Sequence, residues 1–367
     1  MFAGPVSAAA PDVPSVPVLL LVDAGSGQQL FARQPDLAFV PASVTKVMTA
    51  YTAFELIRAG KLRADQRFIV SPGAYAAWHM QGTSMWLRQG EAVPVDALLR
   101  GITTVSANDA AAVLAEGAGG SVQGWTALMN AQARRLGMTR SRFATPNGWP
   151  DNGATYVSAR DLVVLGDALV RRHPQLYRRY FGQPSFAWGG VTQINKDPLS
   201  GVVAGADGIK TGYTREAGYN FLGSAERQGR RLFVVVAGAR SVGERAQAAR
   251  GLIEWGFADW ESRPLFALGA QIGAVRVQGG DARSVGVMAQ RGVSIALPRG
   301  QVGQGFILTI RYDGPLIAPI AKGQQIARLT SSSAGVPPIN IPLYAAEAVG
   351  PAGPLDRLWN GLMGLFA

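Results

Sequence analysis

The sequence has no cysteine, only two histidines and only five lysines, and each scarcity excludes a class of chemistry. Without cysteine the chain has no disulfide framework, no thiolate metal site and no cysteine nucleophile. His79 and His173 are too few to build a histidine-rich metal site. No apolar run approaches the roughly 20 residues that a membrane-spanning helix needs, so the sequence predicts no integral membrane protein.

The first 15 residues also lack any basic residue, and the first basic residue is Arg33. A secretory signal peptide needs a basic region followed by an apolar one, and neither is visible here. The segment Met1–Ser15 is rich in proline, alanine and serine, which predicts a flexible N-terminal tail.

Charge of one sign dominates, with 35 basic against 24 acidic residues and a formal net charge of +11. This balance favours an anionic partner, which can be nucleic acid, an acidic membrane surface or a carboxylate-bearing substrate. Almost all of the basic residues are arginine. Each lysine is therefore a candidate functional residue, because lysine can lose its proton at working pH and arginine cannot.

At 367 residues the chain predicts two or three domains. We expect a catalytic α+β domain over residues 16–262, with an antiparallel five-stranded sheet flanked by helices. Strands are predicted near both ends of this domain and helices between or after them. The predicted strands are 16–22, 28–33, 208–213, 219–226 and 231–239, and the predicted helices are 44–58, 95–102, 109–116, 122–136, 159–171 and 244–260.

Short alternating runs separated by glycine and proline follow, and they predict a small β-rich domain over residues 263–350. Residues 351–367 form a linker and a last segment, Leu355–Ala367, whose apolar residues recur with helical spacing. At about 1.5 Å per residue this helix is too short to cross a bilayer of roughly 30 Å. Its apolar stripe therefore either lies in a membrane surface or packs on the β domain.

Ser43 and Lys46 form the first chemical motif, S-V-T-K, at the start of a predicted helix. They lie one turn apart on the same face, so the amine of Lys46 can reach the hydroxyl of Ser43. A serine hydroxyl becomes nucleophilic when a nearby base takes its proton. A lysine amine can be that base if burial or a second cation depresses its pKa from roughly 10.4. Alone, the motif equally describes a helix-capping serine and an exposed lysine.

Two further motifs follow. Ser106-Ala107-Asn108 precedes a predicted helix, where serine and asparagine also gather for capping alone. Lys210-Thr211-Gly212 ends a predicted strand, where a cation and a hydroxyl would bind a substrate carboxylate. The order S-x-x-K, S-x-N, K-T-G is far more specific than any one of the three.

With these motifs in this order, the chain resembles the penicillin-binding serine D-alanyl-D-alanine carboxypeptidases of low molecular mass. The likeness covers nearly the whole chain. It implies a catalytic domain akin to serine β-lactamases, a β domain, and a C-terminal amphipathic helix, Leu355–Ala367, on the outer face of the cytoplasmic membrane. It also implies a periplasmic location, so the absence of a visible signal peptide suggests a shortened N-terminus.

The resemblance implies a role for each motif residue. Ser43 would be the acylated nucleophile and Lys46 its general base. Ser106 would pass a proton to the leaving D-alanine, and Asn108 would hold Lys46 and the substrate backbone. The remaining implied residues bind substrate. Lys210 would supply positive potential, and Thr211 and Arg245 would bind the terminal carboxylate. The backbone N–H groups of Ser43 and Tyr213, which follows Gly212, would form the oxyanion hole.

The implied substrates are peptidoglycan stem peptides ending in D-Ala-D-Ala, with β-lactam antibiotics as inhibitors and with no metal or organic cofactor.

Three alternatives compete with this interpretation. A serine β-lactamase of the Ser-Asp-Asn class needs a glutamate for deacylation, but residues 117–215 contain none and position 107 is alanine. A nucleic-acid-binding protein would cluster its basic residues on one face, whereas these are spread along the chain. A catalytically dead wall-binding scaffold would not need Ser43, Lys46 and Lys210.

Overall fold

The computed structural model describes residues 11–300, 305–333 and 335–353, which divide into two compact units. One unit holds Pro11–Val22 with Leu30–Gly256, and the other holds Asp23–Gln29 with the chain from Phe257 onward. Residues 11–15 lie in neither helix nor strand, and the rest of the expected N-terminal tail lies outside the described residues. The predicted helix Leu355–Ala367 lies outside them too.

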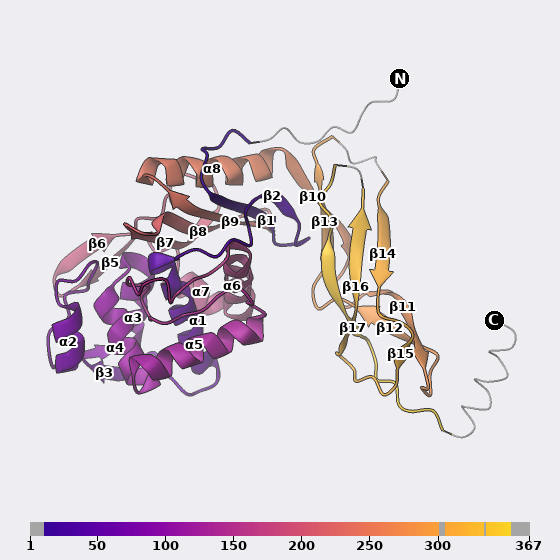
Figure 1. Cartoon of the computed structure of the whole chain (residues 1–367), viewed down its shortest axis with the longest axis horizontal. Coiled ribbons are helices and arrows are strands. Elements are labelled where there is room, and N and C mark those ends of the chain that lie inside the picture. The colour runs from indigo at the N-terminus through magenta and orange to yellow at the C-terminus, as the bar shows by residue number, and fades with distance from the viewer. Residues whose placement is uncertain (1–10, 301–304, 334, 354–367) are drawn as a thin grey trace, which may run out of the picture. The chain divides into compact units, whose positions relative to one another are not determined.

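The first unit is built on the predicted five-stranded sheet, whose strand order is β2-β1-β9-β8-β7 (Figure 1). The register of β7, β8 and β9 is antiparallel, and β7 is an edge strand. The strands are β1 (Val18–Asp23), β2 (Gln29–Arg33), β7 (Ala206–Thr214), β8 (Gly218–Arg227) and β9 (Arg230–Ala239). The α+β prediction is confirmed.

Helices cover both faces of this sheet. α8 lies along one face, and α1 and α6 lie with the other helices on the opposite one (Figure 1). This explains the unbroken apolar run Leu232–Val236 in β9, because residues on both faces of the strand are buried. The helices are α1 (Lys46–Arg58), α2 (Pro72–Trp78), α3 (Val95–Arg100), α4 (Asn108–Gly119), α5 (Val122–Leu136), α6 (Ala159–Arg172), α7 (Pro174–Tyr180) and α8 (Val242–Ala258).

All six predicted helices are present, with small differences at their ends. The helix predicted to reach Trp260 ends at Ala258, because Trp260 begins a strand. The sequence analysis missed α2 and α7. Both are seven residues long and begin at a proline, so they are too short to show a helical period. It also missed two small hairpins, β3 (Arg67–Ile69) with β4 (Ala92–Pro94) and β5 (Ser185–Trp188) with β6 (Val191–Ile194).

The second unit contains the predicted β domain. A six-stranded sheet has the order β14-β16-β17-β12-β11-β15, and β10 pairs with β13. The buried core is aliphatic, and much of it consists of valine, isoleucine and leucine. The strands are β10 (Trp260–Phe266), β11 (Gln271–Gln278), β12 (Ser284–Met288), β13 (Val293–Pro298), β14 (Ile307–Arg311), β15 (Leu316–Ile317), β16 (Gln325–Ser332) and β17 (Asn340–Ala345).

Five of these strands match the short alternating runs of the sequence at 271–277, 285–288, 306–312, 325–329 and 340–345, whereas β10, β13 and β15 were not predicted. Within the described residues, no helix is both long enough and apolar enough to span a bilayer.

Candidate active site

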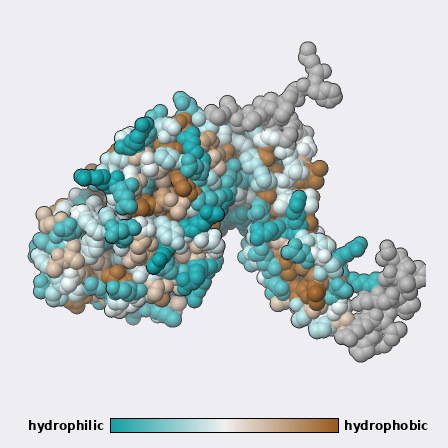
Figure 2. Space-filling view, in the orientation of Figure 1, coloured by the Kyte–Doolittle hydropathy of each residue, from teal (hydrophilic) through white to brown (hydrophobic). Residues whose placement is uncertain are grey.

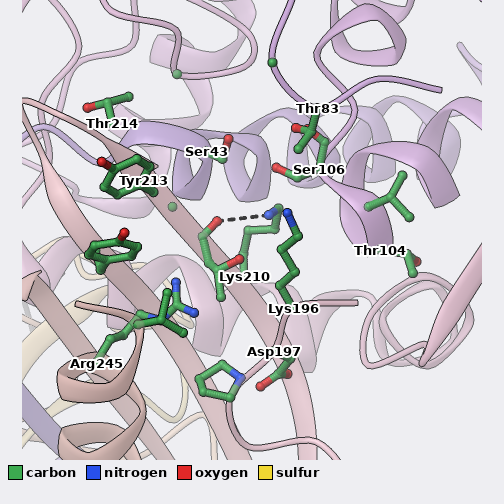
Figure 3. Close-up of a pocket in the computed structure, with 18 of the residues that line it drawn as sticks. Ser43, Thr83, Thr104, Ser106, Lys196, Asp197, Lys210, Tyr213, Thr214 and Arg245 are labelled. Atoms are coloured by element: carbon green, nitrogen blue, oxygen red, sulfur yellow. Dashed lines mark hydrogen bonds between the residues drawn. The ribbon is translucent and has the colours of Figure 1, made fainter. Parts of the chain in front are cut away.

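A cleft of about 660 Å³ lies in the first unit, and all three sequence motifs open into it (Figure 3). Its wall combines the turn before α1, the segment before α4, the loop after residue 146, the segment between β6 and β7, the edge strand β7 and the start of α8. Every candidate residue named from the sequence except the buried Lys46 lines the cleft: Ser43, Ser106, Asn108, Lys210, Thr211, Gly212, Tyr213 and Arg245.

Ser43 lies in a 3-10 turn, Ala42–Thr45, and the α-helix begins at Lys46. The turn is entered through Ala42, whose φ of +49° lies in the left-handed region that residues with a side chain rarely adopt. Such a conformation costs on the order of 1–3 kcal/mol and concentrates at functional sites. This backbone leaves Ser43 half-buried, while Ala42 and Val44 are completely buried.

The amine of Lys46 is buried, with the residue 1% exposed, and it makes three hydrogen bonds. Its Nζ lies 2.8 Å from each of three oxygens, namely Ser43 Oγ, Asn108 Oδ1 and the backbone oxygen of Asn147. The last two are carbonyl oxygens that only accept. A neutral amine has two hydrogens for those two carbonyls, so its lone pair is left for the hydroxyl of Ser43. The geometry therefore fits a base that takes the proton of Ser43.

The electrostatic surroundings favour that neutral amine. Burial, followed by the positive charge of Lys210, holds the pKa of Lys46 well below its usual value, and Asp109 opposes them. Asp109 is occupied elsewhere, since its carboxylate accepts a hydrogen bond from Ser84 Oγ at 2.6 Å and others from backbone N–H groups of the same segment. Lys46 thus has no ion-pair partner among the described residues.

The second motif brings Asn108 to Lys46 and Ser106 to the cleft. The amide of Asn108 is oriented by two contacts, because Oδ1 accepts from Lys46 and Nδ2 donates to the backbone oxygen of Gln81 at 3.2 Å. Ser106 has a φ of +67°, again in the left-handed region, and ends the π-helical turn Gly101–Val105. Figure 3 shows its side chain facing the cleft near Lys210.

The third motif lies on β7. Lys210 is 4% exposed, and its Nζ donates to the backbone oxygen of Thr211 at 2.9 Å. Burial and the charge of Arg245 lower the pKa of Lys210 to about 7. Gly212 is required by space, because a Cβ there would lie 2.5 Å from the oxygen of Pro41 and 3.1 Å from the nitrogen of Ser43. Glycine thus lets the strand run directly against the nucleophile turn.

Arg245 reaches the same cleft from α8. An arginine on a helix is usually exposed, but Arg245 is only 5% exposed. Its guanidinium lies over the ring of Tyr219, with the carbon 5.8 Å from the ring centre, and its buried Nε has no hydrogen-bond partner. Tyr213 stacks on the ring of Tyr219, with the two ring centres 4.2 Å apart, and is 53% exposed. An unpaired buried cation of this kind fits an anionic ligand.

Two cleft residues were missed by the sequence analysis. Asn147 binds Lys46 through its backbone oxygen, so no side-chain pattern could reveal it. Lys196 lies between β6 and β7 and extends toward Lys210, close enough to contribute to that lysine's lowered pKa (Figure 3). The sequence marked Lys196 only as one of five lysines, because no motif surrounds it.

Comparison with known proteins agrees with this site. Residues 5–241 match the family model for D-alanyl-D-alanine carboxypeptidase, and residues 260–351 match the model for the C-terminal domain of penicillin-binding protein 5. The D-alanyl-D-alanine carboxypeptidase DacA of Haemophilus influenzae is 32% identical over 357 residues, which are 95% of this chain and 90% of that protein. DacA of Escherichia coli K12 is 32% identical over 86% of this chain and 80% of its own length.

Solved structures give the same result. Penicillin-binding protein 5 from Haemophilus influenzae has a TM-score of 0.77 and 31% identity, covering 95% of this chain and all of that one. The ampicillin-bound penicillin-binding protein D2 of Listeria monocytogenes has a TM-score of 0.60 and 29% identity, covering 66% of this chain and 98% of that one. The chain therefore belongs to the D-alanyl-D-alanine carboxypeptidases, serine hydrolases of peptidoglycan with the penicillin-binding fold and a C-terminal β domain.

Proposed function

We propose that Ser43 attacks the carbonyl carbon of the D-Ala-D-Ala bond and that Lys46 takes its proton. The observation that carries this proposal is the buried amine 2.8 Å from Ser43 Oγ, with its two other contacts on carbonyl oxygens. Such an amine is a base without a counterion, and the burial that lowers its pKa favours the unprotonated form.

The next step expels D-alanine. Ser106 passes the proton to the leaving amine, and Asn108 holds Lys46 in place while its amide edge faces the substrate. The backbone N–H groups of Ser43 and Tyr213 stabilise the oxyanion. The contact of Gly212 with the nucleophile turn supports this assignment, because it brings the two backbones together at that point.

Three cleft residues recognise the free carboxylate at the end of the stem peptide. Thr211 donates its hydroxyl, while Lys210 and the buried Arg245 supply positive charge. Selection of a terminal carboxylate makes the enzyme a carboxypeptidase that releases a single D-alanine. Water then hydrolyses the acyl-enzyme and frees the shortened peptide.

β-Lactams acylate the same serine, and we expect the resulting adduct to be hydrolysed slowly. The β-lactamases that use Ser-Asp-Asn activate the deacylating water with a glutamate. Residues 117–215 contain no glutamate, and position 107 is alanine. The antibiotic is therefore an inhibitor of this enzyme and a poor substrate.

Intact-mass measurement after benzylpenicillin tests the nucleophile. We expect one adduct per chain, absent in Ser43→Ala. Release of D-alanine from a diacetylated tripeptide ending in D-Ala-D-Ala then tests the reaction. An adduct that persists in Ser43→Ala would refute the assignment.

We also propose that the enzyme works in the periplasm, attached to the outer face of the cytoplasmic membrane by the apolar stripe of residues 355–367. Within this scheme residues 16–262 are the catalytic domain, 263–350 the β domain and 351–367 the linker and anchor. The ends of the two matching family models, at residues 241 and 351, support these boundaries to within about twenty residues.

A further inference from the structure

The described chain ends beside an exposed isoleucine of the β domain. Both features are held by Gln278, the last residue of β11, and by Gly279, which follows it. The backbone oxygen of Gln278 accepts a hydrogen bond from the N–H of Ala318 at 3.1 Å, and that of Gly279 accepts one from the N–H of Ala352 at 2.9 Å. Ile317 is the register partner of Gln278. The segment that follows residue 353 therefore starts within a few residues' length of Ile317.

Ile317 points away from the core of the β domain. Its neighbours Leu316 and Ala318 pack against the buried core, so the alternation of a strand turns Ile317 outward. It is 77% exposed and lies on the edge strand β15, between the exposed prolines 315 and 319. Figure 2 shows apolar side chains gathered over the part of the domain where Figure 1 labels β15.

The sequence beyond residue 353 carries an apolar stripe made of Leu355, Leu358, Trp359, Leu362, Met363 and Phe366. One acidic and one basic residue, Asp356 and Arg357, cancel, so the stripe has no basic face to strengthen membrane binding. Membrane binding by such a segment strengthens with the apolar area that it buries, so a second apolar contact beside it would strengthen the attachment.

We propose that Ile317, with the two prolines beside it, is this second contact and enters the lipid surface on which residues 355–367 lie. The inference rests on the membrane attachment proposed above and adds a site in the β domain to it. A lipid surface is the occupant because the exposed apolar group lies where an apolar, membrane-binding segment leaves the domain.

Vesicle binding of the full-length chain tests this site. Sedimentation with vesicles of phosphatidylethanolamine and phosphatidylglycerol gives the partition coefficient of each variant. We expect Ile317→Glu to lower the partition coefficient about tenfold, because the transfer of one isoleucine side chain from water to an apolar phase changes the equilibrium by at least about that factor. Ile317→Trp should bind at least as well as the wild type, since tryptophan favours the headgroup level.

Ile307→Glu is the matched control. Ile307 is 67% exposed on β14, the opposite edge strand of the same sheet, so this variant adds the same charge away from the chain's exit. Equal vesicle binding by Ile317→Glu and Ile307→Glu would overturn the second contact. So would stronger binding by Ile317→Glu, because it would mean that the stripe normally packs on β15.

Leu362→Glu separates the two proposals. If it leaves vesicle binding unchanged, the attachment through residues 355–367 is wrong. If it lowers binding while Ile317→Glu behaves like the Ile307→Glu control, the attachment stands and only the second contact fails. Release of D-alanine should be the same in the Ile317 and Ile307 variants, because neither position lines the cleft.

Discussion

The two ends of α1 bury ionisable side chains in different ways. At its start, Lys46 is hydrogen-bonded only to neutral groups, namely a hydroxyl and two carbonyl oxygens. Near its end, the carboxylate of Glu55 is paired with His173 Nε2 at 2.7 Å and with Arg58 at 2.7 Å. Both residues are at most 9% exposed.

This difference separates a reactive group from a structural one. Burial without a counterion destabilises the charged form of Lys46 and leaves a free base. At Glu55 burial alone would raise the pKa, but the hydrogen bonds and charges of Arg58 and His173 outweigh it and lower the pKa. The same helix thus carries a base at one end and a compensated ion pair at the other.

The largest effect is expected at the reactive end. Ser43→Ala should lower D-alanine release by about a millionfold, as removal of a catalytic serine does elsewhere. Lys46→Arg should be nearly as damaging, because arginine keeps its proton and cannot act as a base. Steady-state release of D-alanine measures both. Activity of Lys46→Arg within tenfold of the wild type would refute a lysine base.

A smaller loss is expected from Arg245→Gln. Removing one partner of a buried charged hydrogen bond costs about 2–5 kcal/mol, so kcat/KM should fall about thirtyfold or more. The loss should be much smaller for a substrate whose terminal carboxylate is replaced by an amide. An equal loss for both substrates would show that Arg245 does not contact that carboxylate.

The pH profile should respond to Lys210, whose pKa of about 7 makes it positive below pH 7 and neutral above. A cation is needed for the substrate carboxylate, so kcat/KM in the free enzyme should decline as pH rises through that value. The acid side of the profile follows Lys46, which must lose its proton to act. In Lys210→Arg the alkaline decline should move to higher pH, whereas an unchanged decline would assign it to another group.

The smallest effect on activity is expected at the compensated end. Glu55→Ala leaves the buried imidazole of His173 without its hydrogen-bond partner and should lower the free energy of unfolding by about 1–3 kcal/mol, with acylation by benzylpenicillin unchanged. Arg58→Ala is the control. The side chain of Arg58 is 61% exposed, so its removal should have little effect on the free energy of unfolding. Urea unfolding measures both.

Acid should destabilise the folded protein through this buried pair. Both pKa values are lowered in the folded state, that of His173 chiefly by burial. The unfolded chain therefore binds protons at higher pH than the folded one, and the free energy of unfolding falls as pH drops below about 6.5. Glu55 favours the protonated imidazole, so its removal lowers the pKa of His173 further. The difference in stability between wild type and Glu55→Ala should therefore grow between about pH 7 and about pH 5.5, as measured by urea unfolding.

Much of the fold and of the site could be predicted from the sequence. The apolar run of β9, the glycine turns and the helical periods predicted the sheet and six of the helices that flank it. Ser43, Lys46, Asn108 and Lys210 could be selected because few residue types do this chemistry and two of the five lysines fall in matching motifs.

What could not be predicted depends on distant contacts. Nothing local marks Asn147, because it serves through its backbone. Arg245 was named only through the family resemblance, because its burial depends on the packing of α8 against Tyr219. The 3-10 turn at Ser43 was likewise invisible, since the left-handed φ of Ala42 is imposed by its tertiary surroundings. Short strands such as β15 carry too few residues to show a period.

Gly148 has a consequence for antibiotic resistance. It adjoins Asn147, and a Cβ at this position would lie 1.8 Å from the backbone oxygen of Ala42 and 2.7 Å from Thr45 Oγ1. The backbone there also has a φ of +74°. A carboxylate that could activate water against a penicilloyl adduct therefore cannot be introduced at residue 148 by one mutation. Evolution toward drug hydrolysis would have to rebuild this loop, and the nucleophile turn beneath it, together.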